Sequence, residues 1–185
     1  QVYADQREFL SVVGASSPLF LVNGNHEQAA GTHLDGTPDN PAVLAGNARN
    51  DFFALPAPDA FYSGDTEEVP FVGLPRDYYA WTWGDALFVV IDPYWHSPVP
   101  VDVAVGDDER GQANRQRDWW GMSIGDAQYQ WLKATLQQSN TTYKFVFSHH
   151  VMGTGRGGVE EARLYEWGGK SPNGADEFAQ RRPTW

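Results

Sequence analysis

The sequence predicts an α/β fold in which helices cover a layered sheet. A helix-like segment is followed by a short apolar segment twice, at Tyr3 to Val22 and at Asp126 to Ser148. This is the order expected of a helix that precedes a buried strand. Between these two units, alternating aromatic residues, a Gly-Asp pair and an apolar run predict an antiparallel hairpin. The order of the segments favours a layered α-β-β-α arrangement.

The first unit is expected to end in polar residues. Val2 to Val13 has the apolar spacing of one helical face. Pro18 to Glu27 follows and reads PLFLVNGNHE, in which four consecutive apolar residues predict a buried strand. Gly24 permits a tight turn with positive φ. Asn25 and His26 are therefore expected side by side at the carboxyl end of this strand.

The middle of the chain predicts one helix, an irregular insertion and the hairpin. Ala42 to Phe53 is expected to form a short helix, whereas Leu55 to Pro75 contains four prolines and has no sustained period. Tyr78 to Trp83 alternates as a strand does, and a Gly-Asp turn follows. Ala86 to Asp92 is apolar enough for a strand that is buried on both faces.

The second unit repeats the plan of the first. Asp126 is expected to cap a helix that runs to about Ser139. Tyr143 to Met152 then reads YKFVFSHHVM, an expected buried strand that runs into His149 and His150. Open sheets bind ligands at the carboxyl ends of their strands. The two strand ends are therefore expected to share one site.

Composition limits the class of protein. The chain has 185 residues, 41% of them apolar, and no domain linker, which predicts a single domain over residues 1–185. A formal net charge of -11 argues against sequence-independent nucleic-acid binding and against binding to anionic membranes. No apolar run is long enough to span a bilayer. The absence of cysteine excludes disulfides, thiolate zinc sites and cysteine nucleophiles.

The polar residues at the two strand ends have the chemistry of metal ligands. An amide oxygen (Asn25) and imidazole nitrogens (His26, His149, His150) suit zinc, manganese or iron. A pair of such ions can activate water and hold the oxygens of an in-line phosphoryl displacement. Two protein ligands do not complete a site that needs about four. From these residues alone, packed histidines and a metal centre both stay open.

Four segments together resemble the calcineurin-like metallophosphoesterase superfamily, which includes the purple acid phosphatases. They are Asn-His-Glu after an apolar strand, the YAWTWGDALFVVIDP hairpin, a helix with WLKATL and the KFVFSHH strand. The resemblance implies a phosphomonoesterase or phosphodiesterase that acts on a small-molecule phosphoester. It also implies a centre of two divalent or trivalent ions, iron, zinc or manganese.

The resemblance assigns roles to individual residues. It implies that Asn25 is a metal ligand through its side-chain oxygen, and that His149 is a second ligand to the same ion. His150 takes the place of His149 if the register slips by one residue. His26 is the imidazole that contacts the phosphoryl oxygen or protonates the leaving group, a role that suits a group titrating near neutral pH.

Three motifs of that family are absent from this sequence. They are Asp-x-His and Gly-Asp-x-x-Asp before the Asn-His turn, and Gly-His-x-His after the SHH strand. We therefore expect a central fragment of the catalytic domain, incomplete at both ends and itself inactive or nearly so, whereas the full-length protein hydrolyses phosphoesters. Compartment and oligomeric state stay open, with analogy to secreted phosphatases favouring an extracytoplasmic location.

Two arginines are further candidates for phosphate binding. Arg156 lies in the glycine-rich stretch that follows His150, and Arg49 lies shortly after the Asn-His turn. A guanidinium can bind a phosphate through two parallel hydrogen bonds. A loop arginine in contact with solvent explains each position equally well.

Two other classes of protein are alternatives. Gly153, Gly155 and Gly158 match the G-x-G-x-x-G of dinucleotide-binding oxidoreductases. However, SHHVM separates them from the apolar strand, and no later strand completes a βαβ unit. A non-catalytic carbohydrate-binding module would instead use its tryptophans, although core packing explains Trp81 and Trp83 more simply. The candidates for such a module are Trp81, Trp83, Trp95, Trp119 and Trp120.

Overall fold

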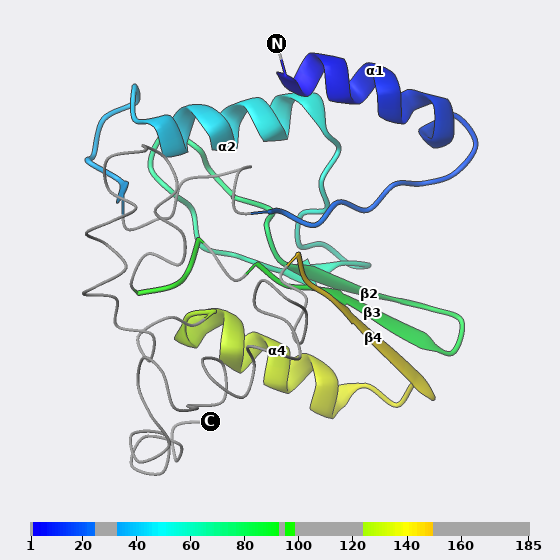
Figure 1. The fold of residues 1–185 in the computed structure, drawn as a ribbon. Helices are drawn as coiled ribbons and strands as arrows, with labels where there is room; N and C mark the ends of the chain where they lie inside the picture. Colours follow the sequence, from blue (N-terminus) through cyan, green and yellow to red (C-terminus); the bar gives the residue numbers. More distant parts are fainter. Residues whose placement is uncertain (1, 25–32, 93–94, 99–123, 150–185) are drawn as a thin grey trace, which may run out of the picture.

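The computed structural model describes residues 2–24, 33–92, 95–98 and 124–149. It shows a mixed four-stranded sheet with helices on both sides (Figure 1). The helices are α1 (Val2–Gly14), α2 (Pro41–Phe52) and α4 (Asp126–Gln138). The strands are β1 (Ser63–Gly64), β2 (Tyr79–Trp83), β3 (Ala86–Val90) and β4 (Tyr143–Phe147). Figure 1 shows α1 and α2 on one side of the sheet and α4 on the other. The predicted α/β class is confirmed.

The strands follow one another across the sheet in chain order, β1-β2-β3-β4. β2 is antiparallel to both β1 and β3, whereas β3 and β4 are parallel. The predicted hairpin is confirmed by the Tyr79–Val90 and Trp83–Ala86 pairs, with Gly84 at a φ of 59° in its turn. Consequently the ends of β1, β3 and β4 and the start of β2 lie at one edge of the sheet.

The face of the sheet that carries Ala80, Leu87 and Val89 packs on α4. These three residues are buried, and the partly buried hydrophobic residues packed against them include Trp131, Leu132 and Leu136. The last two share a helical face because they are four positions apart. The helix that the sequence predicted here is therefore confirmed.

The start of α4 differs from the prediction. Gly125, at a φ of 77°, is the N-cap residue, and Asp126, expected as the cap, is the first helical residue. A Cβ at position 125 would collide with the backbone oxygen of His96. A close approach between two segments thus requires glycine where an isolated helix favours a polar cap.

The segment Pro18 to Val22 packs on the opposite face without forming a strand, so that prediction was wrong. Phe20 stacks on Trp81 with ring centroids 4.0 Å apart. Val22 packs with Phe20 against the buried Tyr79, Trp81 and Val90. Within the described residues the segment belongs to no ladder. Its predicted burial is met only in part, because Phe20 and Val22 are partly buried by packing on the sheet face, whereas Leu19 is 40% exposed.

The Tyr143 to Phe147 strand exists, but its expected burial was wrong. All five residues of β4 are exposed, including Phe145 at 46% and Val146 at 48%. β3 is the only strand that pairs with β4 among the described residues. In contrast, β3 lies between two strands and buries Leu87, Val89 and Val90, largely as predicted.

Helix α2 holds the irregular insertion that follows it. Asn40 caps the helix by accepting a hydrogen bond from the Ala42 amide at 2.9 Å, and Pro41 occupies the first turn. On the surface of α2, Asn50 donates to the Leu74 carbonyl oxygen at 3.1 Å. The predicted helix and the predicted irregular stretch are both confirmed, and β1 is a short strand within the latter.

Within the described part of the chain, no helix combines the length and the apolar character that a membrane crossing requires.

Candidate functional site

Buried polar residues gather at one edge of the sheet. Asp65 follows β1, Asp77 lies just before β2, and Asp92 follows β3 after one intervening residue. Their exposed fractions are 0%, 1% and 0%. His149 is two positions after the last residue of β4, and it lies at the same edge because β3 and β4 are parallel. We call this edge, defined by Asp65, Asp77, Asp92 and His149, the polar edge.

Asp92 connects three parts of the chain at the polar edge. Its Oδ2 accepts a hydrogen bond from Asn23 Nδ2 at 3.3 Å, and its Oδ1 accepts one from the Trp95 amide at 3.2 Å. The side chain of Gln128 on α4 accepts from the Asp92 amide at 2.9 Å and donates to the Asp92 carbonyl at 2.7 Å. Asp92 thereby attaches both the Asn23 segment and α4 to the end of β3.

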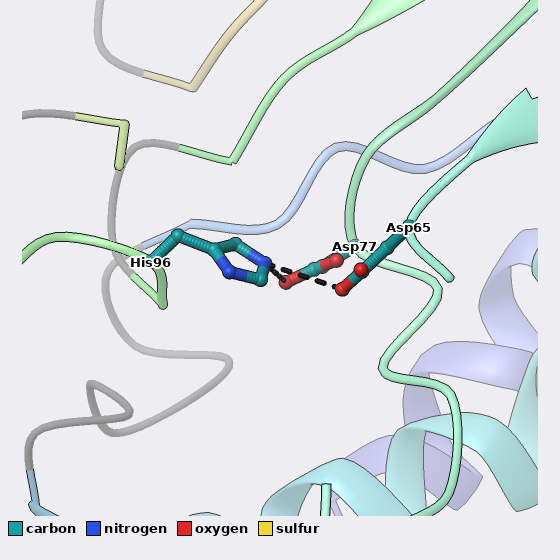
Figure 2. Close-up of side chains that lie close together, drawn as sticks. All are labelled: Asp65, Asp77 and His96. Carbon is teal, nitrogen blue, oxygen red and sulfur yellow. Dashed lines mark hydrogen bonds and ion pairs between the residues drawn. The ribbon is translucent and has the colours of Figure 1, made fainter. Parts of the chain in front are cut away.

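A second group at the same edge combines two carboxylates with an imidazole. Nε2 of His96 lies 2.9 Å from Asp77 Oδ2 and 3.3 Å from Asp65 Oδ2. Figure 2 shows the ring directed at both carboxylates. The Glu67 amide donates to Asp65 Oδ1 at 2.9 Å, and the Tyr78 hydroxyl donates to the same oxygen at 3.3 Å. We call these three residues the Asp65–Asp77–His96 cluster.

Charge and burial compete within this cluster. Burial disfavours the charged form of His96, but its contacts with Asp65 and Asp77 outweigh burial and raise the pKa of His96 to about 10. Burial would raise the pKa of Asp65, yet the contact with His96 and the Glu67 amide hold that pKa below its ordinary value of 3.8. Burial and the two neighbouring carboxylates raise the pKa of Tyr78. Without a bound ligand, the cluster therefore contains an imidazolium at neutral pH.

The structure describes only part of the site predicted from the sequence. His149 is exposed and follows β4 at the polar edge. Asn25, His26, His150 and Arg156 lie outside the described residues, as do Gly153, Gly155 and Gly158. The predicted approach of Asn25 to His149 thus stays a prediction. Asn23, two positions earlier in the chain, is described and lies against Asp92.

Arg49 is buried near the same segment. It is 2% exposed, and its Nη2 donates to the Pro75 carbonyl oxygen at 2.7 Å. It also lines a cavity of about 460 Å³, together with Asn23, Leu21, Val22 and residues of α1. The cavity brings a guanidinium and an amide to a common space. Phosphate binding by Arg49 stays a prediction.

The tryptophans proposed for sugar binding have different environments. Trp81 is 9% exposed and Trp95 is 6% exposed, so both belong to the interior. Trp83 is 73% exposed next to the hairpin turn, contrary to the expectation that it packs in the core. Trp119 and Trp120 lie outside the described residues. Among the described residues, these tryptophans therefore do not form a common exposed surface.

Sequence reasoning missed most of the polar edge. Asp65, Asp77 and His96 belong to no motif and are separated by intervals of 12 and 19 residues. A readable signal existed only for Asp92, the polar residue that ends a nearly continuous apolar run. A scan of family models, a search of curated proteins and a search of solved structures each returned no match. Function is accordingly proposed from the polar edge and the sequence motifs.

Proposed function

We propose that this chain is part of a metal-dependent phosphoester hydrolase whose reaction centre forms at the polar edge. The proposal rests above all on the hydrogen bond from Asn23 to Asp92. This hydrogen bond joins the end of β3 and the segment that precedes the Asn-His turn. The parallel pairing of β3 with β4 keeps the start of the SHH sequence at that same edge. We also propose that the complete catalytic domain has the layered α-β-β-α arrangement.

Chain connectivity supports a shared site for Asn25 and His149. Asn25 is two positions after Asn23, which limits the distance between their Cα atoms to about 7 Å. The Ile91 amide donates to the Phe147 carbonyl oxygen at 3.0 Å, two residues before His149. Neighbouring strands lie about 4.8 Å apart. These constraints favour an amide oxygen and an imidazole that reach a common ion.

Each residue of the proposed centre has a separate task. Asn25 and His149 hold and orient an ion, and His26 protonates the leaving oxygen as a general acid. Metal ions held by these residues would activate a water molecule and offset the negative charge of the phosphoryl group. Flanking segments of the full-length protein provide the remaining ligands. Either a phosphomonoester or a phosphodiester is compatible with these roles.

The decisive experiment is an assay of the full-length protein with p-nitrophenyl phosphate and bis(p-nitrophenyl) phosphate, with and without added Mn²⁺ or Zn²⁺. We expect metal-dependent turnover, and His26→Ala should lower kcat/KM at least about 100-fold because a positioned general acid is lost. Asn25→Ala and His149→Ala should also weaken the metal dependence. His33→Ala, at an exposed histidine outside the site, should match the unaltered protein.

Two outcomes would contradict parts of this proposal. Full-length protein without metal-dependent turnover would remove the hydrolase assignment. Strong metal-dependent turnover by the 185-residue chain alone would contradict the expectation that flanking ligands are required, while it would leave the reaction class intact.

Arg49 provides a narrower prediction. In the full-length protein, Arg49→Ala should raise KM for phosphoesters, because its guanidinium lines the cavity that Asn23 also lines. The loss of its hydrogen bond to Pro75 should also lower stability. Steady-state kinetics below the unfolding temperature separate the two effects, with Arg7→Ala on the exposed surface of α1 as the control. A less stable variant with unchanged KM and kcat would assign Arg49 a structural role alone.

A further inference from the structure

We propose that the Asp65–Asp77–His96 cluster is a binding site for a divalent metal ion such as Zn²⁺ or Mn²⁺. The three ligands come from the end of β1, the start of β2 and the segment after β3. The bound ion would join these three parts of the polar edge. The evidence for this site does not depend on the hydrolytic centre proposed for Asn25 and His149.

The distances within the cluster match those between ligands of one ion. Zinc binds imidazole nitrogen and carboxylate oxygen at about 2.0–2.2 Å, which places neighbouring ligands about 3.0–3.5 Å apart in octahedral or tetrahedral geometry. His96 Nε2 lies 2.9 Å and 3.3 Å from the two Oδ2 atoms. All three ligand atoms lie within 4.8 Å of one another. A small ion therefore fits between them with minor movement of the side chains.

The charge of the cluster is an independent reason to expect a cation. Asp65 and Asp77 are 0% and 1% exposed, and His96 is their only ion-pair partner in the described part of the chain. Even a protonated imidazole leaves one buried negative charge uncompensated, which is costly in a protein interior. A divalent ion bound to a neutral imidazole and two carboxylates brings the net charge of the cluster to zero.

One carboxylate oxygen is also left without a hydrogen bond. Asp65 Oδ2 is buried and accepts none from the described residues, although it faces His96 Nε2. Buried carboxylate oxygens ordinarily receive hydrogen bonds or bind ions. The other oxygen of Asp65 is held by the Glu67 amide and the Tyr78 hydroxyl. Oδ2 is thus fixed in position for a ligand bond.

The chemistry of the ligands selects the ion and its role. Carboxylate and imidazole together suit zinc, manganese or iron. The side chain of His96 is only 11% exposed and those of both aspartates are 0% exposed. Such enclosure is typical of ions that stabilise a fold. A bidentate carboxylate or one water completes the coordination.

Calorimetric titration of the chelator-treated 185-residue chain with Zn²⁺ or Mn²⁺ tests the site. We expect the cluster to bind one ion. Asp65→Asn or Asp77→Asn should lower the affinity for that ion about 100-fold. Asp51→Asn, on the exposed surface of α2, should bind as the unaltered chain does. The double variant Asn25→Ala/His149→Ala should retain this ion, which separates the cluster from the proposed hydrolytic centre.

A second variant gives a direct spectroscopic signal. The chain has no cysteine, so a thiolate-to-Co²⁺ charge-transfer band in Asp77→Cys can come only from position 77. We expect that band in protein whose circular dichroism matches the unaltered chain. Three results would overturn the proposal: no ion bound by the unaltered chain, binding that both asparagine variants leave unchanged, or a folded Asp77→Cys variant without the band.

Discussion

Replacing Gln128 with methionine is expected to lower the free energy of unfolding by about 3–5 kcal/mol, because each buried group left unsatisfied costs about 1–3 kcal/mol. Gln128 is fully buried, and its side chain forms three hydrogen bonds. Two join α4 to the backbone of Asp92, at 2.9 Å and 2.7 Å, and one reaches the Ile124 carbonyl at 3.0 Å. Methionine has a similar length and keeps the packing, so the loss reports the polar contacts.

Urea unfolding of the 185-residue chain, followed by far-UV circular dichroism and linear extrapolation, measures this change. Gln130→Met is the matched control, since Gln130 is exposed on the same helix. It should alter the free energy of unfolding by no more than about 0.5 kcal/mol. Equal effects of the two substitutions would show that the hydrogen bonds between α4 and Asp92 do not stabilise the polar edge.

His96→Gln is expected to cost a similar amount in chelator-treated protein. The substitution removes the imidazolium between two buried carboxylates, and breaking a buried ion pair in this way costs about 3–5 kcal/mol. Glutamine retains a hydrogen-bond donor but carries no charge. The loss therefore arises mainly from the uncompensated charge of Asp65 and Asp77, which are both buried.

The contribution of His96 should depend on pH in a defined direction. Since its folded-state pKa is raised from 6.5 to about 10, its stabilisation is complete below about pH 6.5 and lost as pH rises through about 10. The pKa of Asp65 is lowered from 3.8. Its contribution is therefore present above about pH 4 and lost as pH falls through the folded-state value. The stability difference between the unaltered chain and His96→Gln should be largest between these limits.

Unfolding at pH 6 and pH 9 in the presence of chelator checks this dependence. The difference between the two proteins should be clearly smaller at pH 9. His33→Gln serves as the control, because His33 is exposed and its substitution should give a small difference at both values. A difference for His96→Gln that is the same at pH 6 and pH 9 would show that its imidazolium does not stabilise the folded chain.

Local patterns were sufficient for the helices and the hairpin. Alternating aromatic residues, a Gly-Asp turn and an apolar run predicted β2 and β3, and the segment from Asp126 to about Ser139 was correctly predicted to form α4. The start of α2 at Asn40–Pro41 also follows local rules. The Asn40 side chain accepts a hydrogen bond from a first-turn amide, and proline has no amide hydrogen there that would need a partner. These features depend on neighbours within a few residues, so they can be recognised in a single sequence.

By itself, the sequence therefore determined the α/β class and the hairpin, and it identified the Asn-His and SHH segments as candidates for function. Only the tertiary structure decided that Phe20 and Val22 pack on a sheet face rather than belonging to a strand, and that glycine rather than aspartate caps α4. It also decided that His96 Nε2 lies 2.9 Å from Asp77 and 3.3 Å from Asp65. The physical reason is that these contacts join residues far apart in the chain. Sheet register and close backbone approach create them, and no local period or turn signal encodes either one.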